Sequence, residues 1–179
     1  MELPSNIICV DIETTDSDSK SGSVIQLSAI AVDKNFEPIK AREFDVFIKP
    51  LDLYRNQKAM EVNKISEEIL KNAATLTEAL EMFESFCDND NILASWGAYF
   101  DVPFLKAQYN KIFRKWPFSY RSFDLKSIAI WESAKRNIPT SSSVSKFLNI
   151  INKEFIGTPH NALDDIKNTI EILRYYKNA

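Results

Sequence analysis

The sequence is short of the residues that build several common kinds of site. Its 179 residues include one histidine, two cysteines and three glycines. Cys9 and Cys87 form no CxxC pair or zinc-like cluster, and Cys9 lies in an apolar stretch. We therefore expect two reduced thiols rather than a disulfide or a thiolate metal site.

Long apolar runs are also missing. No stretch approaches the roughly eighteen apolar residues of a transmembrane helix. Residues 1–5 have neither the basic start nor the apolar core of a signal peptide. We therefore expect a cytoplasmic protein with no membrane partner. The length, with 45% hydrophobic and 26% charged residues, is typical of one globular domain that spans residues 1–179.

The first informative segment runs from Ile7 to Thr15 and is rich in β-branched residues, which predicts a buried strand. Side chains alternate between the faces of a strand, so Asp11 and Glu13 share one face, with Cα atoms roughly 6.6 Å apart. Two such carboxylates repel each other and cost desolvation unless a cation or a proton relieves them. The alternative is that both acids reach solvent where the strand ends.

The second segment, residues 91–105, predicts a short buried strand, a turn at Gly97 and a helix that begins near residue 102 and carries Phe104. Asp101 stands just ahead of Pro103. A carboxylate there can accept hydrogen bonds from free backbone N–H groups and complement the helix dipole. A structural cap is therefore as good an interpretation of Asp101 as a metal ligand.

The third segment, residues 157–169, opens the C-terminal helix. Helical spacing predicts a buried stripe made of Leu163, Ile166, Ile170 and Leu173. Asp165 lies beside this stripe and can point along the edge of the core, whereas Asp164 is expected to be a solvated first-turn acid. His160, the only histidine, precedes Asp165 by five residues; on its own it would be taken as structural or exposed.

In chain order the motifs are Asp-x-Glu on a first strand, an aromatic-Asp-x-x-Phe-Leu segment, and His-x4-Asp near the C-terminus. Together they resemble the DEDDh branch of the 3′ to 5′ exonucleases, the family of proofreading exonuclease subunits and ribonuclease T. The resemblance runs from Ile7 to about Tyr176 and implies a single exonuclease domain over residues 1–179. It implies that His160 is the general base and that four acids hold metal: Asp11, Glu13, Asp101 and Asp165.

The pattern of predicted elements indicates an α/β fold. We expect three antiparallel strands followed by strands alternating with helices: strands at 7–13, 24–33 and 42–48, helical segments over 58–87, a strand at 91–95, a helix at 102–114, a short strand near 123, and helices to the end. Thr75 and Glu78 form a predicted capping box. The resemblance implies a ribonuclease H-like fold, with a central mixed five-stranded sheet flanked by helices.

This combination of groups suits phosphodiester hydrolysis. Two cations about 4 Å apart can polarise the phosphate, bind the attacking water and stabilise the leaving oxygen. Oxygen ligands favour Mg²⁺ or Mn²⁺. A histidine with an unperturbed pKa of about 6.5 can take the proton from water near neutral pH. We expect release of nucleoside 5′-monophosphates from the 3′ end of single-stranded RNA or DNA, or from 3′ overhangs.

The resemblance also implies two substrate contacts. The backbone at Thr14 would hold the terminal sugar, and Ile65 would separate the last bases. Ile65 fits equally well as a core residue ahead of a helix capped by Ser66. Two departures from the family's pattern, Asp16 in place of a common glycine and Trp96 before the third acid, leave the choice between RNA and DNA open.

The net charge of −3 is low for a protein that binds nucleic acid. Without the four proposed ligand acids it becomes +1, and two divalent ions would add further positive charge at the site. Basic residues interleaved with aromatic ones could bind phosphates and stack bases; the alternative is the solvated side of a helix and loop. They are Lys106, Lys111, Arg114, Lys115, Arg121 and Lys126, with Tyr109, Phe113, Trp116, Phe118 and Tyr120.

Two other functions fit the same residues. One is a ribonuclease H-like endonuclease, which needs no free 3′ end, and the other is a non-catalytic adaptor that binds nucleic acid or protein. A pure binding module has no use for so much buried like charge, which favours the exonuclease. The sequence does not determine the oligomeric state, and a homodimer is compatible with it.

Overall fold

A computed structural model describes residues 7–51, 55–88 and 91–178. Residues 1–5, where we expect no signal peptide, lie outside this range. The sheet has five strands in the order β3-β2-β1-β4-β5. They are β1 Ile7–Thr14, β2 Val24–Val32, β3 Pro38–Phe47, β4 Ile92–Ser95 and β5 Ser122–Asp124. The first three pair antiparallel, whereas β4 is parallel to β1 and β5 to β4, so the predicted mixed sheet is confirmed.

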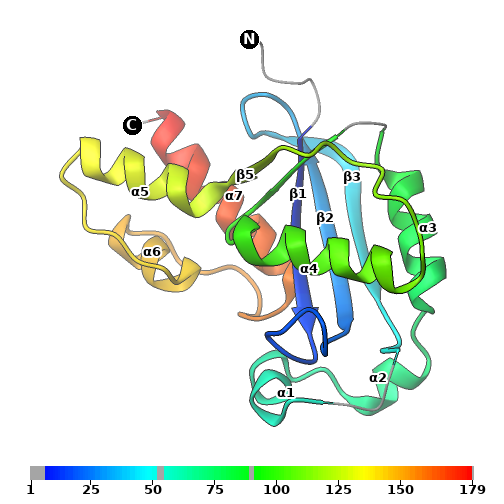
Figure 1. The fold of residues 1–179 in the computed structure, drawn as a ribbon. Coiled ribbons are helices and arrows are strands. Elements are labelled where there is room, and N and C mark those ends of the chain that lie inside the picture. Colours follow the sequence, from blue (N-terminus) through cyan, green and yellow to red (C-terminus); the bar gives the residue numbers. More distant parts are fainter. Residues whose placement is uncertain (1–6, 52–54, 89–90, 179) are drawn as a thin grey trace.

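Helices cover both faces of the sheet: α4 crosses in front of the strands and α7 lies behind them (Figure 1). The short helices α1 and α2 lie below the strands in the same view. The helices of the described residues are α1 Gln57–Asn63, α2 Glu67–Lys71, α3 Leu76–Phe86, α4 Ala98–Lys111, α5 Leu125–Lys135, α6 Val144–Ile150 and α7 Ala162–Asn178. In the described part of the chain, none of them has the length and apolar character needed to cross a bilayer.

The alternation of side chains along β1 divides the core into two layers. Ile8, Val10 and Ile12 belong to a buried cluster with residues of α3 and α4. Ile7 and Cys9 point the other way and pack with residues of α5 and α7. Asp11 and Glu13 continue this second row, so both acids lie on the α7 side of the sheet.

Two elements begin earlier than the sequence predicts. α4 starts at Ala98 rather than near residue 102, because Gly97 acts as its N-cap and the Gly97 carbonyl accepts the N–H of Asp101 at 3.1 Å. β3 starts at Pro38 rather than 42. A proline is tolerated there because β3 is an edge strand, and the missing N–H removes no hydrogen bond from the sheet interior.

The ends of two helices follow from local chemistry. α4 stops at Lys111, before the predicted residue 114, since Phe113 has a φ of 55°, in the left-handed region that a right-handed helix cannot continue. The predicted capping box at the start of α3 is confirmed: Thr75 accepts the backbone N–H of Glu78, and Glu78 accepts that of Thr75.

Candidate active site

The two acids of β1 are consecutive members of one row. Asp11 lies opposite Ser28 and Glu13 opposite Gln26 on β2. Both of these polar neighbours donate instead to Asp45 on β3, Ser28 at 2.6 Å and Gln26 at 2.9 Å. Glu13 is only 9% exposed. The strand therefore presents two carboxylates to the α7 side with no basic residue across from them.

Asp101 reaches the same place from the first turn of α4. It is 6% exposed, and the Ser95 hydroxyl at the end of β4 donates a hydrogen bond to its carboxylate. The Ser95 oxygen in turn accepts the N–H of Gly97 at 3.0 Å. Asp101 is thus held by the end of β4. Gly97 is the N-cap, so Asp101 is not the capping residue, but it lies in the first turn of α4, where a carboxylate complements the helix dipole.

Asp165 comes from the first turn of α7, and His160 from the loop before that helix. The backbone N–H of His160 donates to the Asp165 carboxylate at 3.0 Å, with a φ of 63° at His160. One potential ligand atom each from Glu13, His160 and Asp165 lies within 4.8 Å of the other two. The His160 side chain is exposed, so a loop delivers it to the edge of the acid cluster.

Asp164 lies in the first turn of α7, as the sequence predicts, but it is half-buried rather than solvated. Its carboxylate accepts the N–H of Thr158 at 2.9 Å and lies directly against Gly157. Gly157 has a φ of 89°, and a Cβ at this position would overlap the Asp164 carboxylate. Only glycine meets both conditions. Asp164 therefore helps to shape the loop that carries His160.

Burial raises the pKa values of all four carboxyl groups, and repulsion from other members of the set adds to it at Asp11 and Glu13. Burial is the largest cause at each of them. The pKa of Glu13 rises to about 8, that of Asp101 to about 7 and that of Asp165 to about 6. The pKa of Asp11 lies well above its usual range, first because of burial and then because of the charges of Asp101, Glu13 and Asp165. The charges of Asp101 and Asp165 thus act on both acids of β1.

The four carboxylates and the histidine line one cavity of about 390 Å³. This donor set fits hard divalent cations, because it consists of carboxylate oxygens with one imidazole at the edge. The raised pKa values of Asp11 and Glu13 agree with this, since bound cations would offset both the burial of these charges and the repulsion among them. The residues present thus fit a divalent metal site.

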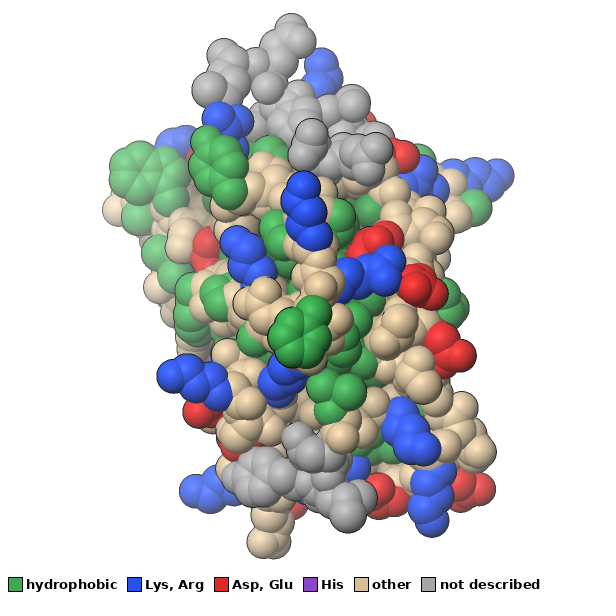
Figure 2. Space-filling model, turned by 45° about the vertical axis from the view of Figure 1, so that its right-hand side comes forward, with side chains coloured by type: hydrophobic (Ala, Val, Ile, Leu, Met, Phe, Trp, Pro, Cys, Tyr) green, Lys and Arg blue, Asp and Glu red, His purple; other side chains and the backbone are tan. Residues whose placement is uncertain are grey.

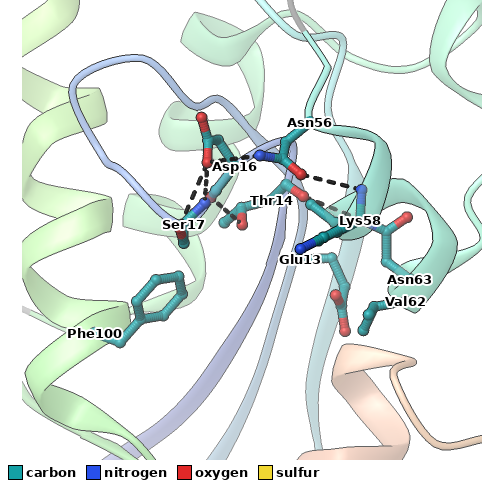
Figure 3. Close-up of a pocket in the computed structure, with 10 residues that line it drawn as sticks. Glu13, Thr14, Asp16, Ser17, Asn56, Lys58, Val62, Asn63 and Phe100 are labelled. Carbon is teal, nitrogen blue, oxygen red and sulfur yellow. Dashed lines mark hydrogen bonds between the residues drawn. The ribbon is translucent and has the colours of Figure 1, made fainter.

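A second cavity, of about 340 Å³, adjoins the first, and Glu13 and Phe100 line both. Figure 3 shows that its walls come from the end of β1, the loop that follows, α1 and α4. Thr14 lies in this wall, and its backbone carbonyl accepts the Asn63 side-chain amide at 3.1 Å. Thr14 therefore borders a space next to the acids, where the resemblance implies a sugar contact.

Ile65 is not among the residues that line these two cavities. It is half-buried after α1, and its N–H donates to the Asn63 side chain at 3.1 Å. Its proposed contact with bases stays a prediction. Val62 lines the second cavity and is 47% exposed. Sequence reasoning missed Val62, because an apolar residue in a short helix gives no signal that separates a core position from a binding one.

Asp16, the residue that replaces a common glycine, ties the loop after β1 to α1. It is 8% exposed, and its carboxylate accepts the N–H of Ser17 at 2.6 Å and the Ser21 hydroxyl at 3.1 Å. The Asn56 amide approaches the same carboxylate at 3.5 Å while the Asn56 oxygen caps α1 (Figure 3). These bonds join the two sides of the second cavity.

Sequence reasoning also missed Asp124 at the end of β5. One carboxylate oxygen caps α5 by accepting the N–H of Ser127 at 2.7 Å. The other accepts the N–H of Ala98 at 3.1 Å and so fastens the start of α4 beside Asp101. The Asp-x-x-Ser pattern is a capping signal that could have found the first role. It carries no information about the contact with α4.

The basic and aromatic run of residues 106–126 does not form one surface. Arg114 pairs with Glu84 at 2.7 Å, and the Lys111 ammonium donates to the Gly22 carbonyl at 2.5 Å. On the face drawn in Figure 2, Lys and Arg side chains are dispersed among acidic, apolar and uncharged groups. Lys126 lines the active-site cavity. Three of the aromatic rings pack against one another: Tyr109, Trp116 and Phe118.

The fold and the site define a class of protein, the ribonuclease H-like nucleases with an acid cluster at the ends of the central strands. The sequence model of the RNase T exonuclease family matches residues 8–173. The chain therefore belongs to this exonuclease family, and the DEDDh resemblance is confirmed.

Curated relatives include the PolC-type DNA polymerases III of Lactococcus lactis and Streptococcus pneumoniae. They are 35% identical over 108 residues and 32% identical over 107 residues. These matches cover 60% and 58% of this chain but only 6% and 7% of the relatives, so the chain corresponds to a small part of those polymerases.

Solved structures share the fold over nearly the whole chain. Cell-death related nuclease 4 has a TM-score of 0.82 at 19% identity and covers 97% of this chain and 64% of its own. The nuclease domain of 3′hExo bound to rAMP, described as a DEDDh family member, has a TM-score of 0.78 at 17% identity. The match covers 98% of this chain and 93% of that domain. Escherichia coli exonuclease I bound to single-stranded DNA and zinc has a TM-score of 0.81 at 18% identity. The match covers 98% of this chain and 41% of exonuclease I.

Proposed function

We propose that this chain is a 3′ to 5′ exonuclease that hydrolyses single-stranded nucleic acid with two divalent ions, Mg²⁺ or Mn²⁺, and releases nucleoside 5′-monophosphates. The observation that carries the proposal is the convergence of four carboxylates and the single histidine on one cavity. Their raised pKa values, caused first by burial and at Asp11 and Glu13 also by repulsion, support it, because buried carboxylates are tolerated where cations bind. Membership of the exonuclease family supports the same activity.

Each acid has a part in this site. Asp11, Glu13, Asp101 and Asp165 would hold the ions through their carboxylate oxygens. When bound, the cations supply the charge that polarises the phosphate and activates water. The Ser95 hydroxyl orients the Asp101 carboxylate, and the His160 backbone orients that of Asp165.

His160 is the proposed proton acceptor. A ring nitrogen lies within 4.8 Å of carboxylate oxygens of Glu13 and Asp165, at the mouth of the cavity. From there the imidazole can take a proton from a water molecule beside the acids and release it to solvent. Its exposure therefore suits the role, since a buried base would need a second group to carry the proton away.

The second cavity is the proposed site of the 3′-terminal nucleoside. The polar backbone of Thr14 and the side chain of Asn63 would face the sugar, while Val62 and Phe100 offer apolar walls to the base. Glu13 borders both cavities, so a nucleoside held here has its 5′ phosphate directed at the acids. In this placement the bound nucleoside is the last one of the strand, so the bond at its 5′ phosphate is the one that is cleaved, and cleavage starts from the 3′ end.

Single-stranded nucleic acid is the proposed substrate. Relatives of this fold were solved with nucleic acid: exonuclease I of Escherichia coli with a dA16 oligonucleotide, and a 3′-exonuclease with a histone mRNA stem-loop, recognised at its 3′ end. These include both DNA and RNA, so the experiment below offers each in matched form.

The test is digestion of matched single-stranded RNA, single-stranded DNA and duplexes with 3′ overhangs, all labelled at the 5′ end. We expect progressive shortening from the 3′ end and release of 5′-mononucleotides with added Mg²⁺ or Mn²⁺. Full activity in EDTA would contradict the metal requirement. His160→Ala is expected to lose about 10²- to 10⁴-fold in rate, and undiminished turnover would remove the base assignment alone.

The same series, extended by a circular single strand, decides between the exonuclease and the two alternatives. A circular single strand has no 3′ end, so its cleavage would identify an endonuclease. Tight binding of the linear strand without hydrolysis in either metal would identify an adaptor.

A further inference from the structure

An aromatic and cationic pair stands at the edge of the acid cavity. The Lys126 ammonium lies 4.7 Å from the centre of the Tyr99 ring and 3.3 Å from the Tyr99 hydroxyl, to which it donates. Tyr99 comes from the first turn of α4 and Lys126 from the first turn of α5. Both residues line the cavity, yet Tyr99 remains 72% exposed. One face of an anchored aromatic ring is thus offered to solvent next to the acids.

The charge at this position is unusual for the cavity. Among the described residues that line it, Lys126 is the only Lys or Arg, and four carboxylates line the same space. An ammonium carries three N–H donors, so Lys126 retains donors for an anion after its bond to the Tyr99 hydroxyl. The pair therefore offers a positive charge and a flat apolar surface at one point.

The arrangement of the two cavities indicates what would occupy this point. They meet at Glu13 and Phe100, and the cavity on the Thr14 side is the proposed site of the terminal nucleoside. A strand cleaved at the acids continues on the other side of the scissile phosphate. In the acid cavity, Tyr99 and Lys126 lie among the lining residues that the Thr14 side does not share.

We propose that Tyr99 and Lys126 bind the nucleotide that precedes the scissile bond, with the base stacked on the Tyr99 ring and its phosphate held by Lys126. This rests on the proposed exonuclease function and deepens it. The site requires an unpaired base, because a base in a duplex has no free face for an aromatic side chain. It tolerates any base, because every base has a π-face.

A second pair of the same chemistry provides a matched control. The Arg121 guanidinium lies 5.2 Å from the centre of the Tyr120 ring, and Tyr120 is 82% exposed. This pair precedes β5, whereas Lys126 follows it, so the two pairs flank opposite ends of that strand. Tyr120 does not line the acid cavity. Tyr120→Ala thus removes an equally exposed tyrosine away from the site.

The experiment measures kcat/KM on two substrates for the wild type and four variants: Tyr99→Ala, Tyr99→Phe, Lys126→Gln and Tyr120→Ala. One is a single-stranded oligonucleotide and the other is the p-nitrophenyl ester of thymidine 5′-monophosphate, which has no nucleotide on the leaving side. We expect Tyr99→Ala to lower the ratio of kcat/KM for the oligonucleotide to that for the ester about tenfold. Tyr99→Phe should keep most of this ratio, and Tyr120→Ala should leave it unchanged.

Salt dependence gives a second readout. Loss of one phosphate contact should reduce the slope of log Kd for the oligonucleotide against log salt by about 0.7 in Lys126→Gln. Kd is measured by fluorescence anisotropy in the Asp11→Asn background, so that binding is followed without turnover.

The outcomes separate this inference from the proposed function. If Tyr99→Ala lowers kcat/KM equally for both substrates, or for neither, the inference is wrong while the exonuclease proposal stands. If the wild-type chain hydrolyses neither substrate, the exonuclease proposal is wrong. The anisotropy series then still decides on the pair, because an unchanged Kd in Tyr99→Ala would overturn it and a raised Kd would support it.

Discussion

The two faces of β1 have opposite tasks. On one face, Ile8, Val10 and Ile12 are all buried in the cluster with α3 and α4. On the other, Ile7 and Cys9 are buried against α5 and α7, but the next two members of the row are Asp11 and Glu13. One face stabilises the fold along its whole length. The other stabilises it over half its length and then holds like charges together.

The difference shows how a strand can be both scaffold and site. The apolar half of the second row packs with Ile166 and Ile170, which fixes α7 on the sheet. Asp165 lies one position before Ile166 in the same helix, so this packing also places its carboxylate beside those of Asp11 and Glu13. The free energy gained by burying the apolar half of the row thus offsets the repulsion between the carboxylates of the other half.

Asp11→Asn should have the largest effect and separates the two tasks most sharply. The amide has nearly the same volume but no negative charge to hold a divalent cation, so we expect kcat/KM to fall about 10³-fold or more. Circular dichroism and thermal unfolding should show an intact fold. A variant that keeps wild-type activity would place the metal centre elsewhere.

Ile8→Ala should give the converse result. Ile8 is fully buried on the other face of the strand, so the truncation should lower the free energy of unfolding by about 2–5 kcal/mol. Urea unfolding measures this loss. The folded fraction should keep its kcat/KM, and a thousandfold loss there would mean that the two faces are not separable.

The pH dependence of the metal-free protein tests the charge on the second face. Carboxyl groups with raised pKa values bind more protons in the folded than in the unfolded state, so stability falls as pH rises through that window. For Asp165, Asp101 and Glu13 the window runs from their ordinary values up to about 6, 7 and 8. We expect a lower Tm at pH 8.5 than at pH 5 in EDTA.

Two controls sharpen this expectation. Mg²⁺ or Mn²⁺ at pH 8.5 should restore the Tm, since cations bound to the folded state offset the repulsion. Asp11→Asn should reduce the difference between the two pH values, because it removes one of the interacting charges. A Tm that rises with pH in EDTA would show that the carboxylates do not repel one another in one pocket.

Trp96→Phe should have the smallest effect. The Trp96 indole N–H donates to the Ser142 carbonyl at 2.8 Å, and its ring meets Phe147 edge-on. Phenylalanine keeps an aromatic contact but loses the hydrogen bond, so stability should fall by about 1 kcal/mol in urea unfolding. Because Ser142 lines the acid cavity, a modest rise in KM is also expected. No change in either quantity would mean that this bond does not hold the loop.

Part of the site could be predicted from the sequence because it depends on local periodicity. The two-residue repeat of a strand places Asp11 and Glu13 on one face, and the helical spacing that buries Ile166 and Ile170 puts Asp165 at the edge of the core. The start of α4 was misplaced because Gly97 caps it through backbone geometry alone, which leaves no side-chain signal. Asp164 was misjudged because its partner, the Thr158 N–H, lies in a loop whose path has no periodic pattern.

By itself, the sequence determined the strands, the family motifs and the residues able to bind metal, because these follow from nearest-neighbour chemistry along the chain. Only the tertiary structure decided which of those groups meet. The contacts between Asp124 and Ala98, between Asp16 and Asn56, and between Tyr99 and Lys126 join segments 26 to 40 positions apart. Such contacts arise when helices pack on a twisted sheet, and no local sequence pattern specifies which distant segments will contact each other.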